Sequence, residues 1–204
     1  MEGLLIALIP MFAWGSIGFV SNKIGGRPNQ QTFGMTLGAL LFAIIVWLFK
    51  QPEMTASLWI FGILGGILWS VGQNGQFQAM KYMGVSVANP LSSGAQLVGG
   101  SLVGALVFHE WTKPIQFILG LTALTLLVIG FYFSSKRDVS EQALATHQEF
   151  SKGFATIAYS TVGYISYAVL FNNIMKFDAM AVILPMAVGM CLGAICFMKF
   201  RVNF

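Results

Sequence analysis

Charged residues divide this chain into seven long uncharged stretches. The stretches cover residues 3–22, 28–49, 54–80, 82–108, 114–135, 153–175 and 179–198. An α-helix rises about 1.5 Å per residue and the hydrocarbon core of a bilayer is about 30 Å thick, so about 20 residues are enough to span it. Each stretch reaches that length. The pattern therefore predicts an all-α, polytopic transmembrane bundle of seven helices.

Composition supports a lipid environment. The 204 residues are 56% hydrophobic and only 9% charged, whereas about a quarter of the residues in a soluble domain are charged. A soluble fold of this size could not hide so much apolar surface from water. We therefore expect a multi-pass protein of the cell membrane whose main partner is the lipid bilayer.

The loops between the stretches carry Lys and Arg unequally. The side that holds the N-terminus has three of the eleven: Lys50, Lys113 and Lys176. The other side has eight: Lys23, Arg27, Lys81, Lys136, Arg137, Lys152, Lys199 and Arg201. Because basic residues concentrate on the cytoplasmic side, we expect the N-terminus to lie outside. This distribution also explains the net charge of +4 without a nucleic-acid partner.

One long polar segment, residues 134–152, divides the chain. It separates a first five-helix half (1–133) from an incomplete second half of two helices (153–204), and we expect it to be a cytoplasmic linker. Many transporters consist of two similar halves, and an odd number of helices in the first half inverts the second. The spacing therefore predicts the beginning of an inverted repeat.

Motifs of soluble enzymes are absent from the sequence. There is no phosphate-binding Gly-x-x-x-x-Gly-Lys, no His-Glu-x-x-His and no Cys-x-x-Cys. His109 and His147 are both predicted to lie in loops, and Cys191 and Cys196 are best explained as small apolar residues. We therefore predict that the protein is not an enzyme and needs neither a cofactor nor a metal.

Uncharged polar residues concentrate in stretches 54–80 and 82–108. In the first, Trp69, Gln73 and Gln76 share one helical face. In the second, Asn89, Ser93 and Gln96 repeat the same spacing. Amides are costly in hydrocarbon unless they are hydrogen-bonded, so the two stripes should face each other or a wet cavity. Amides with an indole suit a neutral polyhydroxylated ligand. The alternative is hydrogen bonding that only holds the helices together.

The acidic residues bear on energy coupling. All seven lie at the ends of the uncharged stretches or between them, whereas proton-coupled carriers usually place an acid within the membrane. Glu110, in His109-Glu110-Trp111, is the nearest candidate for a proton-linked role. An interfacial anchor, with the Trp at the headgroup level, is the alternative.

Glycines recur four residues apart in several stretches. Such pairs allow close helix approach, so we predict packing contacts at each of them. The pairs are Gly34/Gly38, Gly62/Gly66, Gly100/Gly104 and Gly189/Gly193.

Five segments of the chain form a recognisable set: Ala7–Pro10 with Trp14-Gly15, Leu68–Gln73, Pro90–Gly99, His109–Trp111 and Ser160–Tyr164. They resemble the bacterial glucose/ribose uptake family of the drug/metabolite transporter superfamily. The resemblance implies sugar import across the cytoplasmic membrane by a ten-helix fold, and it leaves proton coupling and association of two copies open. The superfamily's usual cytoplasmic N-terminus opposes the charge-based orientation, which we retain.

We therefore predict a carrier of the glucose or ribose class that works by alternating access. The sugar would bind between stretches 54–80 and 82–108, with Trp14 and Tyr164 nearby. Because the family has three more helices, a truncated inactive remnant or a non-transporting membrane subunit is one alternative. Export of small metabolites or cations is the other.

Overall fold

The computed structural model describes residues 2–134, 147–174 and 177–200, and its helices match the seven uncharged stretches. Their bounds are α1 (Glu2–Ile24), α2 (Pro28–Lys50), α3 (Ala56–Met83), α4 (Val85–Leu106), α5 (Pro114–Ser134), α7 (His147–Val169) and α8 (Ala179–Phe200). A short π-helical segment, η1 (Leu170–Ile174), continues α7. The prediction of an all-α bundle is confirmed for the described residues.

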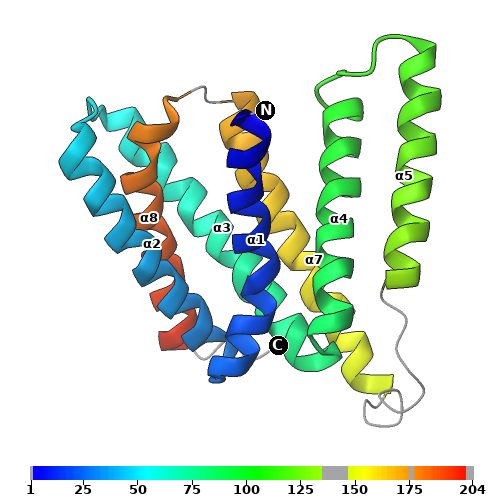
Figure 1. Cartoon of the computed structure of the whole chain (residues 1–204), viewed down its shortest axis with the longest axis horizontal. Helices are drawn as coiled ribbons and strands as arrows, with labels where there is room; N and C mark the ends of the chain where they lie inside the picture. Colours follow the sequence, from blue (N-terminus) through cyan, green and yellow to red (C-terminus); the bar gives the residue numbers. More distant parts are fainter. Residues whose placement is uncertain (1, 135–146, 175–176, 201–204) are drawn as a thin grey trace.

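The helices run up and down, and α3 lies at the centre of the bundle. It packs against α8 and α7 most extensively and also against α2 and α4. Two helices are peripheral: α5 packs on α4, and α1 meets the rest of the bundle chiefly through α4. The two ends of the chain lie at opposite ends of the bundle, as an odd number of crossings requires (Figure 1).

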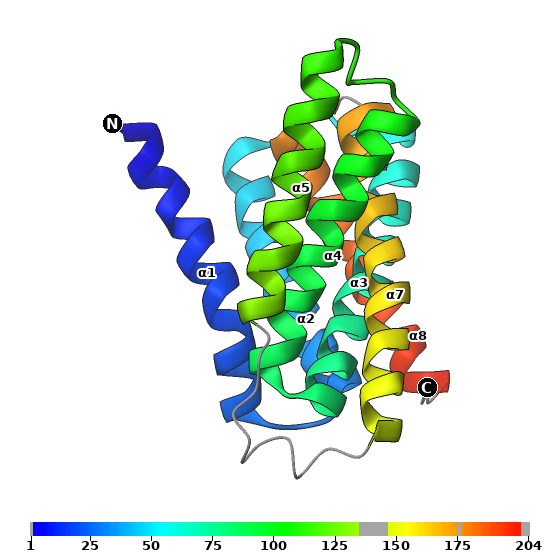
Figure 2. The same ribbon diagram turned by 90° about the vertical axis from the view of Figure 1, so that its right-hand side faces the viewer.

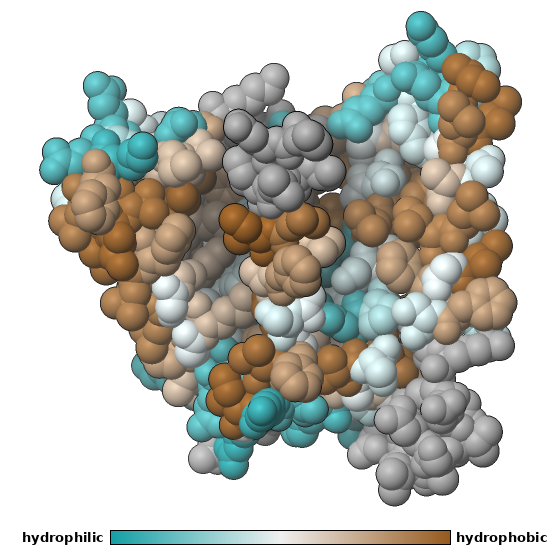
Figure 3. All heavy atoms as spheres, viewed as in Figure 1, coloured by the Kyte–Doolittle hydropathy of each residue, from teal (hydrophilic) through white to brown (hydrophobic). Residues whose placement is uncertain are grey.

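The outer surface of the bundle suits lipid. Among the described residues, five helices are long and apolar enough to cross a membrane: α2, α3, α5, the continuous α7–η1 helix and α8. Helix α4 is uncharged but does not reach that hydropathy, and it carries Asn89, Ser93 and Gln96 of the predicted stripe. Figure 3 shows apolar side chains over the sides of the bundle and polar side chains gathered at its two ends. This is the distribution expected of a polytopic membrane protein.

The helix that follows the predicted linker begins earlier than the sequence pattern indicated. Helix α7 starts at His147, so residues 147–152 form its first turns, and His147 does not lie in a loop. Polar residues can extend a transmembrane helix into the headgroup region, where their side chains meet water. Residues 135–146 of the predicted linker lie outside the described residues. The division into halves remains a prediction.

Glycine packing joins α3 to α8. A Cβ atom at Gly66 would overlap the backbone of Met186, and one at Gly189 would overlap the carbonyl oxygen of Ile63. The Ser70 hydroxyl donates a 2.7 Å hydrogen bond to the Met190 carbonyl at the same crossing. The packing prediction is thus confirmed for Gly62/Gly66 and Gly189/Gly193. It is wrong for Gly34/Gly38, where an added Cβ meets nothing within 4 Å.

Replacing Gly189 by Ala is expected to lower the free energy of unfolding by about 1–3 kcal/mol, since the added methyl group would press against rigid backbone. Thermal melting of the detergent-solubilised protein measures the effect. Gly38→Ala is the control, because the same methyl group meets open space there and gains helix propensity. Equal melting temperatures for the two variants would contradict the close crossing.

Candidate functional site

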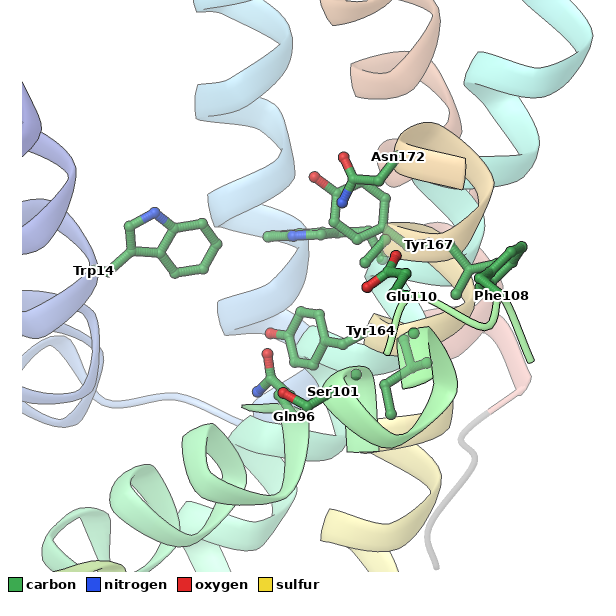
Figure 4. A pocket seen from close by; sticks show the side chains of 14 residues that line it. Trp14, Gln96, Ser101, Phe108, Glu110, Tyr164, Tyr167 and Asn172 are labelled. Carbon is green, nitrogen blue, oxygen red and sulfur yellow. The ribbon is translucent and has the colours of Figure 1, made fainter. Parts of the chain in front are cut away.

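A cavity of about 700 Å³ lies among α1, α3, α4 and α7, and Figure 4 shows the side chains that surround it. Aromatic side chains of α1, α3 and α7 line it together with small and polar residues of α4. Its lining includes Trp14, Trp69, Gln96, Gly100, Ser101, Gly104, Phe108, Glu110, Tyr164, Tyr167 and Asn172. The cavity thus combines apolar ring faces with amide, hydroxyl and carboxylate groups.

The structure brings five of the predicted site residues to this cavity: Trp14, Trp69, Gln96, Tyr164 and Glu110. Three more form a layer behind it, namely Gln73, Gln76 and Asn89. Ser93 is exposed on the same face of α4 as Gln96 and does not line the cavity. Ligand binding by any of these residues remains a prediction.

Tyr164 connects the cavity to the buried amides of α3. Its hydroxyl oxygen lies 2.9 Å from both Gln73 Oε1 and Gln76 Oε1. A hydroxyl has one proton and can donate to only one of them, so the consistent arrangement exchanges the oxygen and nitrogen of Gln73. Gln73 then donates to Tyr164, Tyr164 donates to Gln76, and Gln76 Nε2 donates to Asn89 Oδ1 over 2.9 Å. This chain orients the Tyr164 ring in the cavity wall.

Gln73 is only half satisfied in that chain. Its side chain is fully buried, and its amide nitrogen has no hydrogen-bond partner among the described residues. Exchanging the nitrogen and oxygen transfers the deficit to the oxygen, so one polar atom of Gln73 lacks a protein partner in either orientation. An unsatisfied buried polar atom costs about 1–3 kcal/mol.

Helix α4 presents Gln96 to the cavity. The Gln96 amide nitrogen donates a 3.1 Å hydrogen bond to the hydroxyl of Ser92, which is fully buried one turn earlier. The bond fixes the amide and directs its carbonyl oxygen toward the cavity (Figure 4). One turn later stands Gly100, where an added Cβ would meet no atom within 4 Å. The predicted packing role of Gly100 is therefore wrong, because it borders open space.

In the segment His109–Trp111, which follows α4, the side chains of Glu110 and Trp111 lie in different surroundings. Glu110 turns back into the cavity. Trp111 instead packs on α5, with its ring edge-on to Phe117 at 5.5 Å between ring centroids. An anchoring role thus suits Trp111, while Glu110 belongs to the cavity.

Sequence reasoning missed Tyr167, Asn172 and Ser101 as lining residues. Tyr167 follows Tyr164 by one helical turn, so a search along the helix that carries Tyr164 would have found it. Asn172 stands on the π-helical segment η1, where the helical spacing changes, and no sequence signal marks it. Such segments are frequent at functional sites.

A separate polar cluster on α3 only joins helices. Asn74 Nδ2 donates a 2.9 Å hydrogen bond to Asn29 Oδ1, and Gln78 Nε2 donates a 3.0 Å hydrogen bond to Asn74 Oδ1. Asn29 Nδ2 in turn donates to the Phe197 carbonyl over 2.8 Å. This cluster links α2, α3 and α8. The polar residues of α3 therefore divide between interhelical bonding and the wall of the cavity.

The fold and the cavity define a polytopic membrane protein with a polar and aromatic chamber among its helices. The chain belongs to the sugar transport protein family, whose model matches residues 5–203. This finding confirms the resemblance drawn from the sequence.

Relatives align along the full chain. A Streptococcus pyogenes serotype M6 protein is 68% identical over 203 residues, which are 100% of this chain and 71% of that protein. A Lactococcus lactis protein is 55% identical with the same coverage of both chains. An Enterococcus faecalis protein is 48% identical over 98% of this chain and 71% of its own length. All three are named as candidate sugar uptake proteins. No solved structure matches the chain.

Proposed function

We propose that this chain is a carrier that imports a monosaccharide of the glucose or ribose class by alternating access. The observation that carries the proposal is the cavity between α4 and α7, where Trp69 and Tyr164 face amide and hydroxyl groups. Sugars present flat C–H faces that pack on aromatic rings, and their hydroxyls both donate and accept hydrogen bonds. The names of the relatives, which mention sugar uptake, support a sugar as the substrate.

The shape of the bundle supports an arrangement open at one end. Helix α1 diverges from the bundle toward its N-terminus and approaches α4 at its other end (Figure 2). At that closed end Gly18 packs against Val85 and Asn89, and an added Cβ would lie 2.7 Å from Val85 Cγ1. The Lys/Arg distribution favours an orientation in which the open end faces outside the cell. Uptake would then require α1 and α4 to separate at the Gly18 contact while the open end closes.

The proposal also names the residue that would carry a proton if sugar uptake is coupled to proton entry. A proton-coupled carrier needs a titratable group in the substrate chamber. Glu110 is the acidic side chain among the described residues that line the cavity, and we assign any coupled proton to it.

The direct test is uptake of radiolabelled glucose and ribose by cells that lack their own sugar carriers and express this 204-residue chain. We expect saturable uptake that excess unlabelled sugar competes away. Absence of saturable uptake, with membrane insertion confirmed by surface labelling, would contradict the proposal and favour a non-transporting protein.

Gln96→Leu is expected to reduce that uptake at least about tenfold, because a polar group that binds a sugar hydroxyl is replaced by an apolar one of similar size. Ser93→Ala, on the same helix but outside the cavity, should retain wild-type uptake. Both variants are compared per amount of inserted protein. Equal loss in the two would place the sugar elsewhere on α4.

A further inference from the structure

Helices α1 and α2 leave an apolar groove between them. Residues 25–27 join the two helices, but the helices scarcely pack on each other, and α1 meets the bundle chiefly through α4. A cavity of about 460 Å³ lies in this gap, within the range of about 300–1,000 Å³ that is usual for ligand sites. Apolar side chains and glycines form most of its lining, among them Ile17, Val20, Ile24, Gly34, Met35 and Phe77.

A smaller polar cavity of about 160 Å³ continues the groove at the end of the bundle where α1 is joined to α2. The two cavities have four lining residues in common: Ser21, Gly25, Gln31 and Phe77. The smaller one adds Asn22, Gly26 and Lys81, and no Asp or Glu is among its described lining residues. Together they form one continuous space with an apolar part and a polar, positively charged part.

The connection between α1 and α2 holds the polar part in place. Gly25 and Gly26 have φ values of 76° and 90°, left-handed conformations that glycine adopts without strain. Nε2 of Gln31, on α2, donates hydrogen bonds to the carbonyls of Ser21 over 2.9 Å and Gly25 over 3.1 Å. These bonds tie the end of α1 to α2, whereas no comparable contact closes the apolar groove above them.

Positive charge gathers at the polar part of this space. Lys81 belongs to the last turn of α3, Lys23 to the last turn of α1, and Arg27 precedes the first turn of α2. The two connections that carry these residues lie at the same end of the bundle (Figure 1). Residues 21–31 and 80–85 include no acidic side chain. The Lys/Arg distribution favours the cytoplasmic side for this end, where the membrane surface is negative.

We propose that the groove binds one anionic phospholipid, with an acyl chain between α1 and α2 and the phosphate group in the polar cavity. The Lys81 ammonium, which lies 5.7 Å from the centroid of the Tyr82 ring, and the Asn22 amide would donate to the phosphate oxygens. A soluble anion would leave the apolar walls without a partner. The groove shares no described lining residue with the cavity proposed for the sugar, so this inference does not depend on transport.

Native mass spectrometry of the purified 204-residue chain in detergent provides the test, because it measures the affinity of the first bound lipid. The probes are dioleoyl phosphatidylglycerol and dioleoyl phosphatidylcholine, which have the same acyl chains and differ in net charge. We expect the anionic lipid to bind at least about fivefold more tightly. Lys81→Gln should lower the affinity for phosphatidylglycerol about fivefold and leave that for phosphatidylcholine unchanged.

Gly34→Leu tests the acyl part of the site. An added Cβ at Gly34 meets no atom within 4 Å, so the leucine would occupy the groove and lower the affinity for both lipids. Two matched controls should bind both lipids as the wild-type protein does. Lys50→Gln changes a lysine in the last turn of α2, at the other end of that helix from Arg27, and Gly130→Leu changes an equally open glycine on α5.

The outcomes are distinct. A preference for phosphatidylglycerol that is lost in Lys81→Gln and kept in Lys50→Gln, with both lipids weakened in Gly34→Leu, would support the assignment. Equal affinities of the two lipids for the wild-type protein, or equal losses in Lys81→Gln and Lys50→Gln, would overturn it. Full affinity in Gly34→Leu, or displacement of phosphatidylglycerol by soluble glycerophosphate, would replace the lipid with a soluble phosphate compound.

Discussion

Gly100→Leu should strongly reduce sugar uptake while leaving the protein folded and inserted. Gly100 lies one helical turn beyond Gln96 on the same face of α4 and borders the cavity. An added Cβ there meets no protein atom within 4 Å, so a leucine side chain would extend into the space proposed for the sugar. Crowding a binding site in this way costs about 1–3 kcal/mol, and we expect uptake to fall at least about tenfold.

The matched control is Gly130→Leu on α5. Gly130 is equally open, but it is exposed on the side of the bundle and lines none of the cavity. Leucine is also the better helix former by about 1 kcal/mol, so neither helix should be weakened. Uptake is measured per amount of inserted protein. If Gly100→Leu transports like Gly130→Leu, the sugar does not pass through this cavity.

The fold could be predicted closely from the sequence because lipid leaves few alternatives. Backbone groups in hydrocarbon must be bonded within the segment, so each uncharged stretch had to become a helix. The one substantial shift is the start of α7 at His147. Charged residues there interrupt the apolar pattern but do not prevent a helix from continuing into the interface.

The site could be predicted only in part. Periodicity shows which residues share a face of a helix, but it does not show which other helix packs against that face. The shared face of Gln73 and Gln76 was correct, yet Tyr164 of α7 lies between those amides and the cavity. On α4 the residue that supports Gln96 is Ser92, whereas the sequence pattern selected its neighbour Ser93. Adjacent residues are about 100° apart around a helix, and only the packing of α4 on α7 decides which of them is buried.

Glu110 shows a different limit of sequence reasoning. Helical spacing stops at the end of α4, and the left-handed turn that returns Glu110 to the cavity contains His109 where a glycine would have signalled it. The aromatic neighbour Trp111 suggested an interfacial anchor for the whole triplet. Only the fold shows that the two side chains diverge.

Gln73→Leu is expected to change stability and transport in opposite directions. Leucine removes the polar atom of Gln73 that has no protein partner, and Tyr164 keeps its hydrogen bond to Gln76. The bond that is lost is worth about 0.6 kcal/mol on average within a membrane, whereas an unsatisfied buried atom costs about 1–3 kcal/mol. The free energy of unfolding should therefore rise by about 1 kcal/mol. Uptake should nevertheless fall at least about tenfold, because we assign the spare atom of Gln73 to a hydrogen bond made when Tyr164 moves during transport.

Gln78→Leu makes the same chemical change on the same helix and provides the control. Gln78 donates to Asn74 Oδ1 in the buried cluster that joins α2, α3 and α8, so its loss should lower the melting temperature. Thermal melting in detergent and uptake in cells are measured for both variants. A lower melting temperature for Gln73→Leu would mean that the Gln73 amide of the wild-type protein is fully hydrogen-bonded. Unchanged uptake would mean that the unsatisfied atom of Gln73 has no role in transport. Higher stability combined with lost uptake would show that the unsatisfied amide of Gln73 is kept for function, because it forms its missing hydrogen bond in a second conformation.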